Sequence, residues 1–199
     1  MTAATVVELP IFPLHTVLFP TGVLPLKIFE QRYLEMVGGC MKDDKPFGVC
    51  LIAEGGEVGA PAVPHDVGVT ARIVEWDMPQ LGVLNVVTRG QNRFRIVHRE
   101  VSRQGVVMAH AILLPGERDT PVPESLQTLL PLLRAIAADV GLERMPEPHA
   151  FEDATWVGHR YAEVLPIPLI ARQKLLELDD AIVRLEIISQ YLAQHGLLG

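Results

Sequence analysis

Apolar residues in the first 115 positions occur in short runs separated by proline, glycine or charged residues. Residues 67–76 alternate between apolar and polar positions, a pattern typical of a β-strand with one buried face. Further strands are predicted at residues 47–53, 83–89, 93–97 and 106–114, with a turn at 90–92. Five or six strands without a long helix between them indicate a β-barrel or a curled sheet.

The stretch at residues 9–37 is apolar but carries four prolines. Because proline fixes φ and lacks an N–H, we expect short extended pieces joined by bends rather than an unbroken central strand. A tight turn is predicted at residues 21–22, with positive φ at Gly22. Apolar positions then recur at helical spacing, which predicts a short helix near residues 29–38 that ends at the glycine pair 38–39.

From residue 123 onward, apolar residues recur at the spacing of amphipathic helices. The stripe at 126–140 contains Pro131, which predicts a kink or a helix that begins there. Acidic residues at 152–153 and 179–180 are expected to cap later helices. The predicted fold class is therefore α+β, a β-barrel followed by a helical bundle, at residues 1–118 and 119–199 respectively.

Three motifs resemble those of a known family. L-P-I-F-P-L-x-x-V-L-F-P-x-G-x-L-P-L-x-I-F-E-x-R-Y, at residues 9–33, resembles the opening of the Lon protease N-terminal domain, also called the Lon substrate-binding domain. Gln31 stands where that family often has proline. V-T-R-G-x-x-R-F-R-I at 87–96 and L-P-I-P-x-x-x-R-Q-K-L-L-E-L-D-D-x-x-x-R-L-E at 165–186 are similar to its second and closing motifs. The resemblance implies a PUA-like barrel of mostly antiparallel strands followed by a helical bundle.

The resemblance also implies recognition of polypeptide, either unfolded chains or a particular client, with a separate protease as a further partner. The motifs of Lon's ATPase and Ser-Lys peptidase are missing: the sequence has no G-x-x-x-x-G-K-[ST] and no G-x-S-x-G. We therefore expect a stand-alone, non-catalytic member that needs no cofactor. A small-molecule or hydrolytic pocket is less favoured, because no nucleophile–base pair supports it.

Composition narrows the class of protein further. The formal net charge of −7 argues against a general nucleic-acid binder. No basic leader and no apolar run of membrane-spanning length are evident, so a cytoplasmic location is expected. Cys40 and Cys50 form no metal-ligand motif and are interpreted as small buried residues. The seven histidines show no zinc-site spacing, so no metal is expected.

The proline-broken stretch supplies the first candidate site. Its functional interpretation is an exposed apolar groove for polypeptide. The rim of this groove is predicted to contain Leu18, Phe19, Pro20, Leu24, Trp76 and Met78. The alternative interpretation is that these side chains belong to the core.

A series of arginines supplies the second candidate site. Several of them would share one face of a β-ribbon and could bind phosphates or acidic segments. The series consists of Arg89, Arg93, Arg95, Arg99 and Arg103. RNA binding through this face is the alternative function, although few aromatic residues accompany the arginines. An ion-paired solvated surface is the structural alternative.

The third candidate is the trio Glu30, Arg32 and Tyr33, which also recurs in the family that the chain resembles. We interpret it as structural rather than functional. Glu30 and Arg32 would form a partly buried charge pair that holds the first helix to the barrel, with Arg93 as a further partner.

Overall fold

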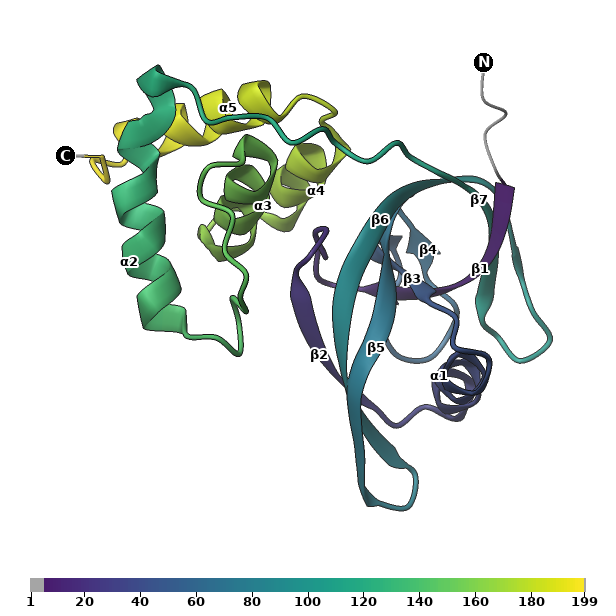
Figure 1. Ribbon diagram of the computed structural model, residues 1–199. Helices are drawn as coiled ribbons and strands as arrows, with labels where there is room; N and C mark the ends of the chain where they lie inside the picture. Colours follow the sequence, from purple (N-terminus) through teal and green to yellow (C-terminus); the bar gives the residue numbers. More distant parts are fainter. Residues whose placement is uncertain (1–5, 199) are drawn as a thin grey trace. The chain divides into compact units, whose positions relative to one another are not determined.

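The computed structural model describes residues 6–198, and the chain divides into two units, Met1–Pro115 and Gly116–Gly199. The predicted boundary, between residues 118 and 119, falls just after this one. The first unit contains β1 (Val6–Leu14), β2 (Val23–Ile28), α1 (Gln31–Asp43), β3 (Phe47–Glu54), β4 (Val63–Pro64), β5 (Val67–Gln80), β6 (Val83–Val101) and β7 (Val107–Leu113) (Figure 1). The second contains the 3-10 helix η1 (Glu124–Leu129), α2 (Leu130–Val140), α3 (Ala154–Val164), α4 (Leu169–Glu177) and α5 (Ala181–Gln194).

The strands of the first unit form a sheet that closes on itself (Figure 1). Neighbouring strands follow the order β1-β7-β6-β5-β3-β4, and a pairing of β1 with β3 closes the circle. That pairing is parallel, whereas the other strand pairings are antiparallel. The predicted barrel-like, mostly antiparallel fold is confirmed. Within residues 6–198 the sheet has seven strands rather than five or six, because β2 and the two-residue β4 also pair.

β1 is one continuous strand although it contains Pro10 and Pro13, so the prediction of separate extended pieces is wrong here. Residues 6–11 pair with β7, and residues 11–14 pair with β3. Each proline therefore lies where β1 is paired on one side, so its missing N–H can face the other side without breaking a ladder. β2 contains Pro25 and pairs with β6 alone among the described strands.

The turn predicted at residues 21–22 is present, and the Gly22 N–H donates to the Phe19 carbonyl at 3.0 Å. The residue with positive φ is Thr21, at 61°, rather than Gly22. This turn lies against Gly90, where an added Cβ would stand 2.2 Å from the Phe19 carbonyl oxygen. The close approach of the backbone therefore requires a glycine at position 90.

The turn predicted at residues 90–92 is instead a bulge, because β6 continues through this point. The register between β5 and β6 shifts there: Val69 pairs with Arg93, but Ala71 pairs with Gly90. Two residues of β6 thus stand opposite one residue of β5, which disturbs the alternation of inward and outward side chains. Arg93 is 5% exposed, so the prediction that it faces outward is wrong.

Phe94 lies fully buried in the barrel core. Its ring occupies space above two glycines of neighbouring strands, because a Cβ added at Gly48 or Gly68 would stand 2.7 or 2.8 Å from the ring. The glycines therefore leave room for the aromatic side chain that fills the interior. One buried cluster of this core consists of Leu9, Ile11, Cys50, Phe94, Ile96, Val107, Ala109 and Ala111.

α1 packs against the barrel through Tyr33, whose ring stacks on Phe12 of β1 with 4.1 Å between ring centroids. The helix does not end at the glycine pair 38–39 as predicted, but continues to Asp43. Its end is fixed by Asp44, which has a left-handed backbone conformation. The N–H of Lys45, the next residue, donates to the Cys40 carbonyl. The packing of its apolar face, rather than the low helix propensity of the two glycines, therefore sets the length of α1.

The helices of the second unit begin where the sequence indicates. Pro131 lies in the first turn of α2, so the helix begins there rather than bending. The Asp153 carboxylate accepts hydrogen bonds from the first N–H groups of α3, and Asp180 does the same for α5. Gly141 terminates α2 with a φ of 74°. No helix in residues 6–198 is both long and apolar enough to cross a membrane.

Candidate functional site

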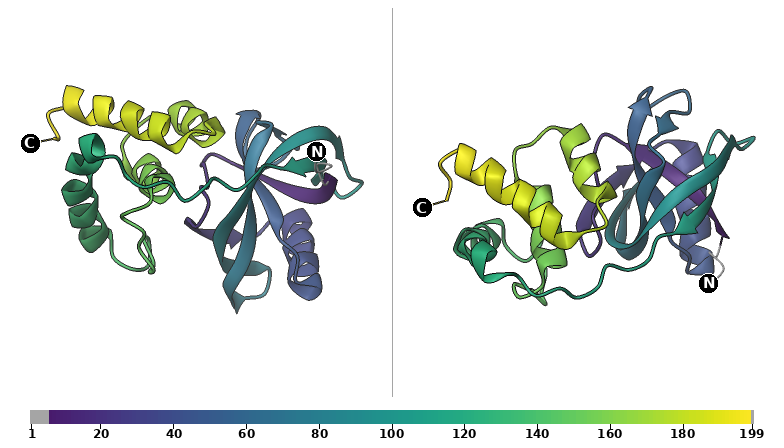
Figure 2. Two further views of the ribbon diagram at one scale, coloured as in Figure 1. Left: turned by 45° about the horizontal axis from the view of Figure 1, so that its top comes forward. Right: turned by 90° about the horizontal axis from the view of Figure 1, so that it is seen from above.

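The β5–β6 hairpin extends beyond the closed part of the sheet (Figures 1 and 2) and carries a group of exposed apolar side chains. Trp76 is 61% exposed and Leu81, at the turn, is 98% exposed. We call this group the hairpin surface; it consists of Val74, Trp76, Met78 and Leu81. Two of the six predicted groove residues, Trp76 and Met78, therefore reach solvent on one element.

The hairpin surface adjoins a hollow of about 360 Å³ between β2, β5 and β6. Trp76, Pro25 and Leu26 contribute apolar walls, while Lys27 and Asp77 contribute charge. Beyond Ala71, β5 pairs with β6 alone in the part of the chain that the structure describes, so one edge of its outer half is unpaired. An unpaired edge beside apolar side chains can add a strand from another polypeptide.

The other four predicted groove residues do not join this surface. Leu18 and Phe19 are buried, and Phe19 has no exposed area, so their placement at an exposed rim is wrong. Pro20 and Leu24 are partly buried. The turn at residues 21–22 follows Leu18 and Phe19 in the chain and lies against the backbone at Gly90.

The five arginines of the predicted arginine face do not form one exposed cluster. Arg93 is buried by the bulge, and Arg99 donates to the Asp66 carboxylate at 3.0 Å. Arg89 is partly buried, whereas three members are exposed: Arg95, Arg103 and the ion-paired Arg99. The ion pair of Arg99 matches the structural interpretation for that residue.

Glu30 and Arg32 form an ion pair of 3.2 Å at the start of α1, and most of both side chains is buried. Arg32 Nη1 donates to the Gly105 carbonyl at 3.0 Å, and the guanidinium lies 4.6 Å from the centre of the Tyr33 ring. Glu30 in turn accepts from the Gly59 N–H at 3.5 Å. The pair thus connects the helix start with two loops of the barrel unit, through Gly59 and Gly105.

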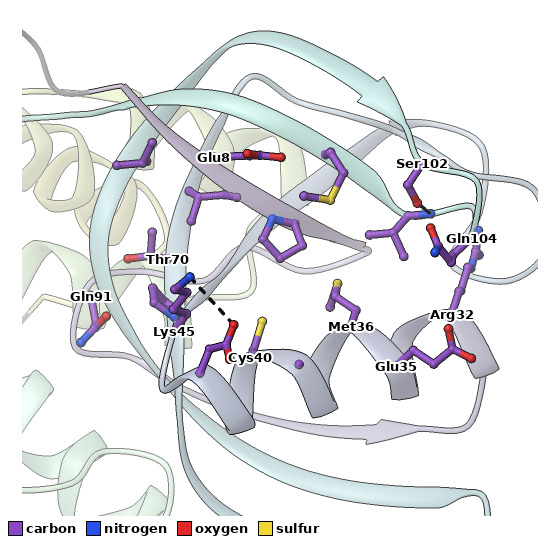
Figure 3. Close-up of a pocket in the computed structure, with 18 of the residues that line it drawn as sticks. Glu8, Arg32, Glu35, Met36, Cys40, Lys45, Thr70, Gln91, Ser102 and Gln104 are labelled. Carbon is purple, nitrogen blue, oxygen red and sulfur yellow. Dashed lines mark hydrogen bonds and ion pairs between the residues drawn. The ribbon is translucent and has the colours of Figure 1, made fainter.

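A larger groove of about 680 Å³ runs along α1, between this helix and β1 and β7 (Figure 3). We call it the α1 groove. Arg32 and Gln104 lie at one end, and Lys45 and Gln91 lie at the other. Its apolar lining includes Val7, Leu9, Pro10, Met36, Cys40, Val106, Met108 and Leu113. Sequence reasoning missed this groove, because its residues come from segments that are neighbours only after the sheet has closed.

Cys40 and Cys50 are free thiols, and both are buried as predicted. Burial raises the pKa of each thiol, most strongly for Cys50, so neither is an activated nucleophile. Across residues 6–198, no three or more His, Cys, Asp or Glu side chains are grouped so that they could hold a metal ion.

A family model described as the ATP-dependent protease La (LON) substrate-binding domain matches residues 8–194. The chain belongs to this family. The match confirms the resemblance seen in the three motifs, and it corresponds to the substrate-binding part of Lon rather than to its catalytic part. The general function of this domain family is substrate recognition.

Curated relatives and solved structures agree with this membership of the Lon substrate-binding family. Lon protease 2 of Herpetosiphon aurantiacus is 29% identical over 203 residues, which cover 98% of this chain and 25% of that protein. Lon protease 2 of Myxococcus xanthus is 29% identical over 197 residues, which cover 92% of this chain and 23% of that protein. The chain thus spans about a quarter of the length of the curated relatives it matches.

The crystal structure of a Lon N-terminal domain protein from Xanthomonas campestris is 34% identical, with a TM-score of 0.77 over 94% of this chain and 98% of that one. The N-terminal domain of Lon protease from the Mycobacterium avium complex has a TM-score of 0.67 at 15% identity, over 95% of this chain and 100% of that one. The second likeness bears on the fold alone.

A buried charge network lies in the second unit of this Lon-family chain. Arg184 donates to both carboxylate oxygens of Glu117, at 2.7 and 2.9 Å, and to the Leu175 carbonyl at 2.9 Å. His159 Nε2 lies 3.2 Å from the same carboxylate. Arg184 belongs to the closing motif, but Glu117 stands in a connecting segment and had no sequence signal.

Burial has the largest influence on both titratable groups of this network. Burial alone would raise the pKa of Glu117, but hydrogen bonds from His159 and Arg184 together with their charges lower it to about 2. Burial lowers the pKa of His159 to about 4, although Glu117 opposes this shift. At neutral pH the carboxylate is therefore charged and the imidazole neutral. The network connects the segment at Glu117 with α3, α4 and α5.

Proposed function

We propose that this protein recognises polypeptide segments with exposed apolar side chains and binds them without chemical change. Unfolded segments differ from native ones in their exposed apolar side chains and unpaired backbone groups. The hairpin surface offers a complement to both: four exposed apolar side chains beside an unpaired edge of β5. Exposed apolar groups of this kind on one projecting element typically mark an interaction site.

The bound polypeptide in this proposal is an unfolded chain or a specific client, and a separate protease is the partner that receives it. Membership of the Lon substrate-binding family supports recognition of polypeptide. The charged residues Arg72, Glu75 and Asp77 along the outer half of β5 bear on its unpaired edge. Such charges discourage two copies from pairing edge to edge, and so keep the edge open for other chains.

The test measures binding of a reduced and carboxymethylated lactalbumin, an unfolded chain, at low and high salt. Binding should persist at high salt, because apolar contacts are not screened. Replacing Trp76, Met78 and Leu81 together by serine should weaken it about tenfold or more, as expected for loss of an aromatic anchor and its neighbours. Unchanged binding by this variant would contradict the proposal.

Two controls make this test specific. Val97→Ser removes an apolar side chain that is 54% exposed and lies on β6 but outside the hairpin surface, so it should leave binding unchanged. Single-stranded RNA is the competing ligand, offered to the protein and to the double variant Arg89→Gln/Arg95→Gln. RNA binding that falls steeply with salt and is lost in this variant would favour the arginine face instead.

A further inference from the structure

The α1 groove is a second concavity in the barrel unit, separate in its lining residues from the hairpin surface. Its volume of about 680 Å³ lies within the range of sites that enclose ligands. Figure 3 shows its lining side chains distributed along the length of α1 rather than around one point. A ligand that fills it is therefore extended, and follows the helix.

Two consecutive glycines in the middle of α1 require an explanation. Glycine in a helix interior costs about 0.5–1 kcal/mol relative to alanine. A Cβ added at Gly38 or Gly39 would meet nothing within 4 Å among residues 6–198, so packing against these residues requires neither glycine. Gly39 lines the α1 groove, whereas Gly38 does not. The missing side chain at Gly39 therefore keeps the groove open where the helix forms its wall.

The groove wall around Gly39 is apolar and adaptable. Met36 of α1 and Met108 of β7 are partly exposed into it, and the Cys40 thiol lies beside them. Methionine side chains are flexible and polarisable, so they can pack against apolar groups of various shapes. This wall suits one or more aliphatic or aromatic side chains of a ligand.

The charges of the groove are mainly negative. Arg32 is paired with Glu30 at 3.2 Å, and Lys45 lies 3.9 Å from Asp43. Two carboxylates in the lining remain without an ion pair among residues 6–198: Glu8, and Glu35, which accepts a hydrogen bond from the neutral amide of Gln31. A ligand with basic side chains near these carboxylates therefore complements the groove.

The two ends of the groove carry neutral hydrogen-bonding side chains. Gln91 and Asn92 stand in the β6 bulge at one end, and Ser102 and Gln104 stand at the other. Amide and hydroxyl groups both donate and accept, as the backbone of an extended peptide requires. This pattern matches a polypeptide better than a compact small molecule.

We propose that the α1 groove binds an extended polypeptide segment in which an apolar side chain lies over Gly39 and basic side chains, lysine or arginine, face Glu8 and Glu35. This is a second polypeptide site, with a sequence preference that the hairpin surface lacks. The two sites together allow one client to be held at an apolar segment and at a neighbouring basic-apolar segment, which raises affinity through linkage.

The probe is a capped six-residue peptide in which leucine alternates with lysine, labelled with a fluorophore and measured by anisotropy at moderate salt. Two comparison peptides replace every lysine by glutamate, or every leucine by serine. The leucine–lysine peptide should bind about tenfold or more tightly than either, because each comparison removes one half of the complementarity. Equal binding of all three peptides, or no binding, would overturn the proposal.

Gly39→Leu and Gly38→Leu form a matched pair of variants on adjacent positions. Both added side chains enter open space, so both proteins should fold with equal or higher melting temperatures. Gly39→Leu fills the groove and should weaken binding of the leucine–lysine peptide about tenfold, while Gly38→Leu should bind as the natural protein does. If peptide binding is weakened in neither variant, or equally in both, the assignment of the peptide to the α1 groove is overturned.

Amide chemical shifts of the unsubstituted protein give a test that needs no variant. The peptide should perturb residues 36–40 and 106–108 and leave residues 74–81 unchanged. Glu8→Gln/Glu35→Gln should also reduce the preference for lysine over glutamate severalfold. The triple serine variant of the hairpin surface should still bind this peptide, so failure of either proposal can be distinguished from failure of the other. Shifts confined to residues 74–81 would place the peptide on the hairpin surface and refute the second site.

Discussion

The two units of this chain exclude water from their interiors by different means. The barrel unit buries few polar side chains, chiefly Thr70, Thr88 and Arg93, and satisfies its backbone through a closed sheet. Four large polar side chains are buried in the described part of the helical unit, namely His159, Arg160, Gln173 and Arg184. Apolar packing thus dominates the first interior, whereas the second depends on charges that must all be paired.

The reason lies in the backbone of each unit. A closed sheet pairs its N–H and C=O groups within the ladder, but every helix leaves carbonyl groups unsatisfied at its C-terminus. In the helical unit, Arg184 donates to the carbonyls of Leu175 and Leu178 at the end of α4. The same guanidinium then binds Glu117, which fixes the connecting segment against α4 and α5. One side chain therefore stabilises several elements, and its loss should affect them together.

The largest expected effect is the loss of Arg184. Arg184→Met should destabilise the helical unit by about 3–5 kcal/mol, because it leaves the Glu117 carboxylate buried without its bidentate partner. Trp156 of α3 is buried and reports on this unit, and in a Trp76→Phe background it is the one tryptophan of the chain. Its fluorescence during urea unfolding gives the free energy of unfolding.

Two variants control this measurement. Arg118→Met removes an exposed arginine next to Glu117 and should change the free energy by less than about 0.5 kcal/mol. Glu117→Leu combined with Arg184→Met removes both charges and should recover part of the loss. Hydrogen exchange of β3 amides reports on the barrel unit and should be unaffected; faster exchange there would contradict the contrast between the two interiors.

Acid should also distinguish the units. The pKa of His159 is lowered from 6.5 to about 4 on folding, so its contribution to stability is complete above pH 6.5 and is lost as the pH falls toward 4. The pKa of Glu117 is lowered from 4.5 to about 2, and its contribution is lost between these values. Trp156 fluorescence should show a lower melting temperature at pH 4.5 than at pH 7.

His159→Gln replaces the titrating imidazole with a neutral amide that can still donate toward Glu117. The melting temperature of this variant should change less between pH 7 and pH 4.5 than that of the natural protein. An equal change in melting temperature in both proteins would mean that another group causes the acid sensitivity, and that the depressed pKa of His159 contributes little.

In both units, sequence patterns predicted the helices and strands more successfully than the contacts that one element makes with another. The N-caps Asp153 and Asp180 and the start of α2 at Pro131 depend on neighbours in the chain, so local spacing was sufficient. The continuity of β1 depends on which partner lies on each side of Pro10 and Pro13. No local pattern contains that information.

The candidate site shows the same limit. Trp76 and Met78 are exposed because they lie on a hairpin that extends beyond the closed sheet, whereas Phe19 is buried just before a turn that lies against Gly90. All three are apolar residues near proline, and the sequence does not distinguish them. A single bulge moved Arg93 from the predicted surface to the interior. Exposure therefore followed from strand closure and register.

The smallest expected effect concerns the partly buried ion pair of Glu30 and Arg32 at the start of α1. Glu30→Gln keeps the shape of the side chain but removes the charge opposite Arg32, which still donates to the Gly105 carbonyl. The loss should be about 1 kcal/mol, several times less than for Arg184, because water reaches part of this pair and apolar contacts of Tyr33 continue to hold the helix. Thermal unfolding measures it, with Glu35→Gln on the exposed face of α1 as the control that should not change. A melting temperature untouched by Glu30→Gln would show that apolar packing alone fixes α1, which would make the contrast with the helical unit sharper still.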